Sequence, residues 1–154
     1  MKIEETEKIG RLFFEEMWSK PDLNIADEII DSKYNPSWIH IDKIGPAQIK
    51  HEIKHFRSLF PDLKYRIVEI KGEENKVWVR YKAHATHKGD AWGFNPTNKE
   101  TVFEAAAILY INKEGKVYDM WESYCFYDIL TDLGLVPPFW DLHKHFSNYI
   151  RDSI

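Results

Sequence analysis

Two histidines and a glutamate lie within five residues of one another in His51-Glu-Ile-Lys-His55, which fits the pattern H-E-x-x-H. On a helix this spacing can hold zinc between the two histidines while the glutamate acts as a base. The apolar stripe of the same segment includes Ile49, Ile53 and Phe56, so both histidines are expected to point to solvent on the other side. Since no third ligand is apparent, we expect neither a metal site nor a metal cofactor.

His87 is the strongest single candidate for chemistry. It follows a stretch in which alternate residues from Val77 to Ala85 are apolar, and a period of two places His87 on the same face of that strand. A histidine there can donate a hydrogen bond to a substrate oxygen or take part in proton transfer. The other interpretation is a histidine whose hydrogen bonds are satisfied by the loop backbone after Lys88.

The last predicted strand carries further titratable side chains. Alternation places Val117, Trp121 and Cys125 on one face and Glu122 on the opposite face. A thiol has an ordinary pKa of about 8.5 and is mostly neutral at pH 7. We therefore interpret Cys125 as a neutral buried side chain beside Trp121, but we keep Cys125 and Glu122 together with His87 as the candidate catalytic residues.

Helices and then strands must position these residues. Helical spacing of apolar residues predicts helices over 6–20, 25–31 and 46–60, and a short strand is expected over 36–41. After Asp62 the period changes to two, and strands are expected through residue 125. This order indicates an α+β fold rather than a doubly wound sheet. After Pro137-Pro138, helical spacing predicts a last amphipathic helix that packs on its own domain or on a second subunit.

The composition bounds the function classes. With 154 residues the chain has the size of one domain, and we expect 139–154 to be a helical extension of the domain formed by 1–138. Aromatic residues reach 15%, which favours an aromatic-lined cavity.

The net charge of −4 argues against nucleic-acid binding, although Arg80, Lys82 and His84 form a basic row on one strand face. The single cysteine excludes a disulfide framework, and no apolar run approaches the ~18 residues of a membrane span. A cytoplasmic protein without membrane contact is expected.

Four stretches of the chain are similar to one known family. They are Phe13-Phe-Glu-Glu-Met-Trp with Ile25-Ala-Asp-Glu-Ile-Ile, Gly45-Pro46 with Phe60-Pro-Asp-Leu, Thr86-His-Lys-Gly with Gly93-Phe-Asn-Pro-Thr-Asn-Lys, and Gly115-Lys-Val with Trp121-Glu and Leu130-Thr-Asp-Leu-Gly. In this order they resemble the SnoaL-like polyketide cyclases of the nuclear-transport-factor-like superfamily, over 9–138. The resemblance implies a cone-shaped α+β fold, with N-terminal helices packed in a curved, mixed, mostly antiparallel sheet around an apolar cavity.

The same resemblance implies a function. It suggests cofactor-free acid/base conversion, by aldol-type cyclisation or isomerisation, of a hydrophobic small molecule that bears a carbonyl group. His87 matches the family histidine in Thr-His-x-Gly. The family's acidic residue, four positions after its tryptophan, corresponds to Cys125 here. The alternative is therefore a non-catalytic small-molecule-binding or dimeric interaction module, and whether the chain is an enzyme stays open at this point.

Aromatic and polar side chains on the expected inner faces are candidates for substrate binding: Trp38, His40, Tyr81, Phe103 and Trp121. Trp38 and His40 share a face of the first short strand, although ungapped counting puts the family's histidine position at Ile41. Trp92 and Phe94 either form a lid over the cavity or anchor their loop. A homodimer through the open sheet face is expected and is compatible with either function.

Overall fold

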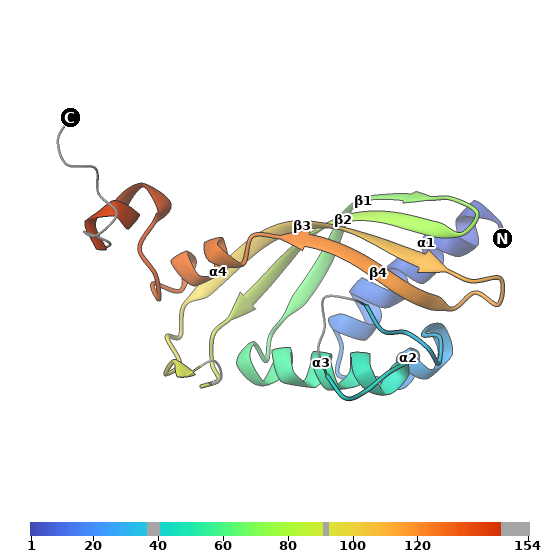
Figure 1. Ribbon diagram of the computed structural model, residues 1–154, viewed down its shortest axis with the longest axis horizontal. Coiled ribbons are helices and arrows are strands. Elements are labelled where there is room, and N and C mark those ends of the chain that lie inside the picture. The colour runs from blue at the N-terminus through green and yellow to red at the C-terminus, as the bar shows by residue number, and fades with distance from the viewer. Residues whose placement is uncertain (37–40, 91–92, 146–154) are drawn as a thin grey trace.

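One curved sheet forms the body of the protein. The computed structural model describes residues 1–36, 41–90 and 93–145, and within these residues four antiparallel strands pair in the order β1-β2-β3-β4. Their bounds are β1 Lys64–Gly72, β2 Lys76–Thr86, β3 Glu100–Ile111 and β4 Val117–Tyr124. The sheet is not closed, and it arches over the N-terminal helices, which lie against its concave side (Figure 1). The predicted α+β fold is confirmed.

The first helix changes its geometry midway. An α-helix, α1 (Ile3–Arg11), continues directly into η1 (Leu12–Trp18), which is a π-helix. In a π-helix each backbone hydrogen bond spans five residues, against four in an α-helix, so each turn holds about one residue more. Two adjacent pairs in η1 are therefore buried together, Phe13 with Phe14 and Met17 with Trp18. The predicted helix over 6–20 is present, but its π-helical half was not expected.

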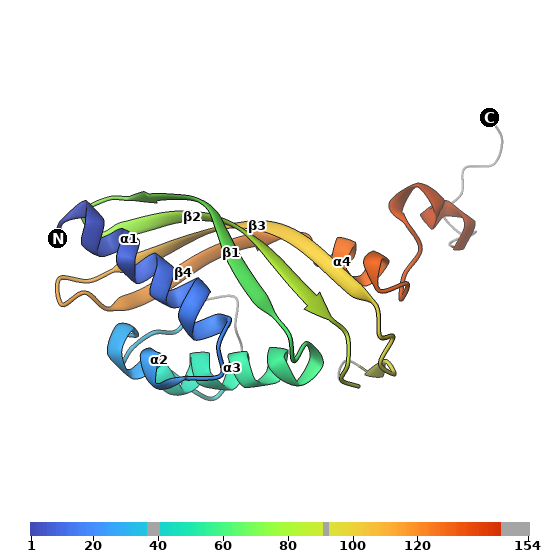
Figure 2. The ribbon, with the colours of Figure 1, turned by 180° about the vertical axis from the view of Figure 1, so that it is seen from behind.

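A second layer of helices closes the concave side. The helix α2 (Asn24–Ile29) is followed by α3 (Pro46–Leu59), which begins with proline at its first position, as predicted. Figure 2 shows α3 running below α1 on the same side of the sheet. The predicted short strand over 36–41 falls mostly on residues 37–40, which lie outside the described part of the chain.

The stretch Thr86-His-Lys-Gly joins the sheet to α3. The backbone N–H groups of Lys88 and Gly89 both donate to the carbonyl oxygen of Leu59, at 2.8 and 3.1 Å. A Cβ atom on Gly89 would lie only 2.1 Å from the carbonyl oxygen of Ser58, so only glycine fits. The glycine of this stretch is thus explained by packing between β2 and α3.

The strand faces follow the predicted alternation in β2 but not in β4. From Val77 to Ala85, alternate residues of β2 are at most 3% exposed and face the helices. In β4, Asp119 pairs with Tyr110 while Val117 pairs with the next residue, so Tyr118 has no partner in β3 and forms a β-bulge. Because the bulge adds one residue, the residues of β4 after Tyr118 face the opposite sides from those that simple alternation predicts. The expectation that Val117 and Trp121 share a face is therefore wrong.

The C-terminal part leaves the body of the protein. After the short helix α4 (Phe126–Asp132), the described chain ends in η3 (Phe139–His145), a 3₁₀ helix. Figures 1 and 2 both show η3 projecting beyond the end of the sheet, and Phe139 and Trp140 are exposed. The rest of the predicted last helix, 146–154, lies outside the described residues. None of the helices in the described ranges is long and apolar enough to cross a membrane.

Candidate functional site

An aromatic cavity lies between the concave face of the sheet, α3 and α4. Two carboxyl groups, Glu52 and Glu122, face it. The remaining wall consists of apolar and aromatic side chains from both layers: Trp18, Phe56, Phe60, Leu63, Tyr65, Tyr81, Phe103, Tyr124, Phe126 and Ile129. The free space inside is about 20 Å³, the room of about one water molecule. A larger ligand can enter only if these side chains move.

Glu122 reaches the cavity because of the bulge in β4. It pairs with Ala107 of β3, a residue on the buried face of the sheet, instead of pointing outward as simple alternation predicted. The hydroxyl of Tyr81 donates a hydrogen bond to its Oε1. Burial raises the pKa of Glu122 to about 7, and the Tyr81 hydrogen bond opposes this rise because it favours the carboxylate. Near neutral pH the group can therefore both take up and release a proton.

Glu52 faces Glu122 from α3. It is only 9% exposed, and its Oε2 is buried without a hydrogen-bond partner among the described residues. Burial, and then the negative charge of Glu122, raise the pKa of Glu52 to about 8. At pH 7 the carboxyl group of Glu52 is thus mainly neutral.

Glu52 is a site residue that the sequence patterns above do not identify, because it lies within the H-E-x-x-H segment, whose histidines point to solvent. His51 and His55 are indeed exposed, as predicted, and in the described ranges no three histidine, cysteine, aspartate or glutamate side chains are grouped to hold a metal ion. The glutamate between them, however, continues the apolar stripe, three residues after Ile49 and four before Phe56. This spacing was the signal that could have identified it.

Three tyrosines, Tyr65, Tyr81 and Tyr124, line the cavity together with the two carboxyl groups. The Tyr81 ring packs 4.9 Å from the ring of Tyr65 and 4.8 Å from that of Phe14. Burial, together with the charge of Glu122, holds the pKa values of Tyr65 and Tyr81 well above their ordinary value and raises the pKa of Tyr124 to about 12. These phenols therefore stay protonated and can act as hydrogen-bond donors.

His87 is buried behind the cavity wall. It is fully buried and is not among the described residues that line the cavity; its ring lies 5.8 Å from that of Phe60, which does line it. The backbone N–H of Thr97 donates to its Nδ1 at 3.2 Å, so the proton of a neutral ring is on Nε2. The loop therefore satisfies one ring nitrogen, whereas Nε2 is buried without a hydrogen-bond partner among the described residues. A catalytic role of His87 stays a prediction.

The other sequence candidates are divided between the two faces of the sheet. Tyr81 and Phe103 line the cavity. Trp121, expected there too, is 49% exposed on the outer face, because the bulge turns it away. Cys125 is exposed, so the expectation of a buried thiol is wrong. Trp38 and His40 lie outside the described residues.

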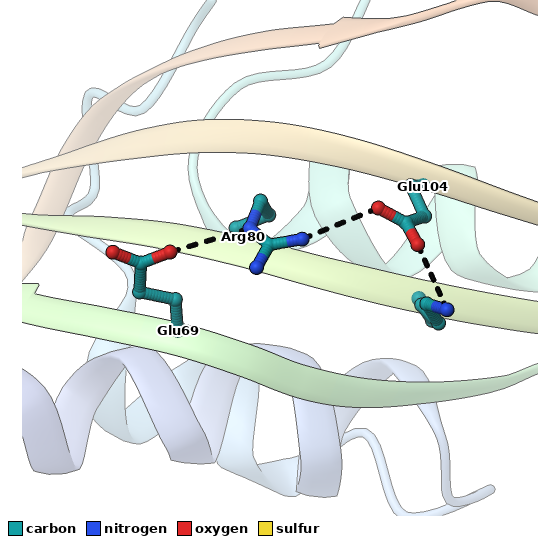
Figure 3. A network of polar contacts seen from close by, with 4 residues as sticks. Glu69, Arg80 and Glu104 are labelled. Atoms are coloured by element: carbon teal, nitrogen blue, oxygen red, sulfur yellow. Dashed lines mark hydrogen bonds and ion pairs between the residues drawn. The ribbon is translucent and has the colours of Figure 1, made fainter.

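The outer face carries charged residues in pairs and a shallow groove. Arg80 lies between Glu69 and Glu104, at 3.3 Å from each (Figure 3), and Lys82 is 2.9 Å from Glu104. The predicted basic row is therefore neutralised by acidic residues of the neighbouring strands. Beside it, a groove of about 420 Å³ is lined by residues of all four strands, among them Trp78, Arg80, Ala106 and Trp121.

The chain is similar to known proteins in sequence pattern and in fold. The family model of the SnoaL-like polyketide cyclases matches residues 8–133, whereas no curated protein sequence matches the chain significantly. TsrD from Streptomyces laurentii has a TM-score of 0.79 at 15% identity, over 88% of this chain and 99% of that one. AclR from Streptomyces galilaeus has a TM-score of 0.75 at 21% identity, over 96% and 93%. A SnoaL-like polyketide cyclase from Agrobacterium tumefaciens has a TM-score of 0.67 at 13% identity, over 87% and 100%. At these identities the structures show a shared fold.

Proposed function

Because the chain belongs to the SnoaL-like polyketide cyclase family, we propose that it binds a hydrophobic small molecule with a carbonyl group in the aromatic cavity and converts it by cofactor-free acid/base chemistry. The observation that carries this proposal is the position of Glu122, a carboxyl group that faces an apolar cavity and accepts a hydrogen bond from Tyr81. A base works best when its pKa is close to the working pH, and the pKa of about 7 meets that condition.

The reaction step begins with proton removal. The Glu122 carboxylate takes a proton from the carbon next to the substrate carbonyl, and the C–H electron pair becomes the C=C bond of an enolate. The π pair of the carbonyl moves to its oxygen. In cyclisation the enolate carbon attacks a second carbonyl, the π pair of that carbonyl moves to its oxygen, and this oxygen takes the proton from Glu122. In isomerisation of a substrate with a C=C bond next to the enolate, the dienolate receives the proton from Glu122 at its far carbon instead. In both outcomes Glu122 gives back the proton that it took and the substrate neither gains nor loses electrons, so no oxidant or reductant is required.

Deuterium uptake measures the first step without knowledge of the natural substrate. We propose 2-tetralone, a bicyclic aromatic ketone with acidic protons beside its carbonyl, as the probe in D₂O. The wild-type protein is expected to accelerate exchange of those protons above the buffer rate. Glu122→Gln is expected to lower this rate at least about 100-fold, because the general base is lost.

A matched control shows whether a change in the exchange rate depends on the cavity. Glu104→Gln changes a carboxyl group on the outer face, next to Arg80 and Lys82, and is expected to keep the wild-type exchange rate. If Glu122→Gln exchanged deuterium as fast as the wild-type protein, Glu122 would not be the base.

Cys125 favours a second candidate, a non-catalytic small-molecule-binding module. This residue corresponds to the family acid in the sequence resemblance, and its side chain is exposed. Binding of 2-tetralone without deuterium exchange, in the wild-type protein and in Cys125→Asp alike, would favour the module over the enzyme.

We further propose a homodimer that forms through the outer face of the sheet. Supporting this proposal, Trp78 is 41% exposed and Trp121 is 49% exposed, and the groove over Ala106 could receive a large side chain from a second copy. A two-fold interface requires such a pairing of protruding and recessed parts on one surface.

A further inference from the structure

We propose that Glu52 is the second catalytic residue, a neutral acid that donates a hydrogen bond to the substrate oxygen while Glu122 removes the proton from carbon. This inference rests on the proposed function and assigns the stabilisation of the enolate to a side chain of α3. The residues that the sequence resemblance implied for catalysis, His87 and Cys125, do not line the cavity, so the group that stabilises the oxygen must come from elsewhere.

The position of Glu52 fits this role. It faces the cavity from the helix layer, whereas Glu122 faces it from the sheet. Its Oε2 is buried and has no hydrogen-bond partner in the described part of the chain. A buried polar atom without a partner costs free energy, and a substrate oxygen held against it would remove that cost. The unpaired atom therefore indicates where the polar end of a ligand binds.

The charged groups around Glu52 favour its neutral form. No ion pair of Glu52 occurs among the residues described. Among the cations of the same helix, Lys50 pairs with Asp27, and Arg57 donates to the backbone carbonyl oxygens of Trp18 and Leu63, at 2.8 and 3.1 Å. The titratable groups coupled to Glu52 are the Glu122 carboxyl and the phenols of Tyr34, Tyr65 and Tyr124. Burial and the charges of the two glutamates raise the pKa values of these phenols. An anionic Glu122 and a neutral Glu52 is the charge state that these neighbours stabilise.

This charge state divides the reaction between the two groups. As Glu122 takes the proton from carbon, negative charge develops on the substrate oxygen, and the Glu52 O–H donates to that oxygen in a site from which water is excluded. A donor placed where charge develops is worth about 10²–10³ in rate. When Glu122 returns the proton to carbon, the charge leaves the oxygen and Glu52 keeps its own proton.

Two substitutions at one position distinguish a donor from a base. Glu52→Gln keeps an N–H donor of similar shape, so it is expected to retain at least about a tenth of the wild-type deuterium uptake with 2-tetralone. Glu52→Leu removes the donor and is expected to lose at least about 100-fold. Leucine fills an apolar site without a charge, so thermal unfolding should show a folded protein for both variants.

Equal rates of Glu52→Leu and the wild-type protein would overturn the inference while leaving the proposed function intact. Complete loss of deuterium uptake in Glu52→Gln would also overturn the inference, because it would show that Glu52 acts as a base and not as a hydrogen-bond donor. If the wild-type protein itself took up no deuterium, the proposed function would fail and this assignment with it.

Infrared spectroscopy tests the neutral acid without any ligand. In the Glu122→Gln background at pH 6, we expect the carbonyl stretching band of one protonated carboxylic acid, and we expect this band to disappear when Glu52→Gln is added. Ordinary glutamates, with pKa values of about 4.3, are ionised at this pH and give no such band. Its absence would show an ionised Glu52 and overturn the inference.

Discussion

At the scale of single residues, two glutamates share one cavity but differ in their hydrogen bonds. Glu122 accepts from Tyr81, whereas the Oε2 of Glu52 has no partner among the described residues. A hydrogen bond to the charged form favours the anion, and burial without one favours the neutral acid. The environments of the two carboxyl groups therefore push them toward different charge states, which is the arrangement that acid/base chemistry on a carbonyl compound needs.

Glu52 also makes stability depend on pH in an unusual direction. Its pKa is about 8 in the folded protein and about 4.3 in the unfolded chain, so between these values the folded state binds more protons. The free energy of unfolding should then fall as pH rises, by about 1.4 kcal/mol per pH unit for this group. The contribution is fully present below about pH 4 and lost above about pH 8.

Urea unfolding of the wild-type protein and Glu52→Gln at pH 5, 7 and 9 measures this effect. We expect the variant to lose less stability between pH 5 and pH 9 than the wild-type protein does. Glu122, with a pKa of about 7, adds a slope of the same sign in both proteins. Parallel curves would show that Glu52 titrates as in the unfolded chain.

At the scale of elements, the bulge in β4 decides which side chains enter the cavity. It turns Met120, Glu122 and Tyr124 to the concave face and leaves Trp121 outside. If all the residues of β4 from Val117 onward paired without a bulge, the strand would present the opposite set.

Two deletions test this role of the bulge. The pairs on both sides of Tyr118 are already in register, so deletion of Tyr118 alone should give a regular strand that still carries Met120 and Glu122 on the concave face, and deuterium exchange with 2-tetralone should be retained. Deletion of both Tyr118 and Asp119 removes one residue more than the bulge holds. It should turn Glu122 outward, abolish the exchange and lower the unfolding free energy, since Met120 leaves the core. An active double-deletion variant would show that β4 does not take its register from the pair of Val117 with Ile111.

The helices and strands could be predicted because their apolar residues recur with the period of a helix or of a strand. Alternation placed Tyr81 and Phe103 on the concave face, and helical spacing placed Ile49 and Ile53 in the core, as the structure has them. A bulge is one residue in an otherwise regular strand, and no period reveals it, so Trp121 was placed on the wrong face. Glu52 was not predicted because a glutamate next to the apolar stripe of a helix normally lies at the edge of that stripe and is exposed to solvent.

At the scale of the whole molecule, the sheet separates two surfaces with different chemistry. Its concave face is apolar and carries the two acids, while its outer face carries paired charges and exposed tryptophans. A homodimer through the outer face would leave the concave side uncovered by the second copy, and α3 lies on that side (Figure 1).

Sedimentation velocity tests the proposed dimer. Trp121→Glu places a charge in the groove that the second copy would cover, and it should shift the protein to a monomer at micromolar concentration. Ile44→Glu alters a side chain of similar exposure, 58%, in the loop before α3 and should leave the dimer intact. A wild-type protein that sediments as a monomer at high concentration would contradict the proposal.

The π-helical segment η1 makes chain length, rather than residue type, responsible for one wall of the cavity. Trp18 lies at the end of this segment and lines the cavity. Each residue of a π-helix turns the chain by less than the roughly 100° of an α-helix, so the same seven residues in regular α-helical geometry would rotate the indole away from the wall. Six α-helical residues turn about as far as seven π-helical ones. Among descendants of a common ancestor, a gap of one residue here should therefore coincide with a regular α-helix whose indole keeps its place.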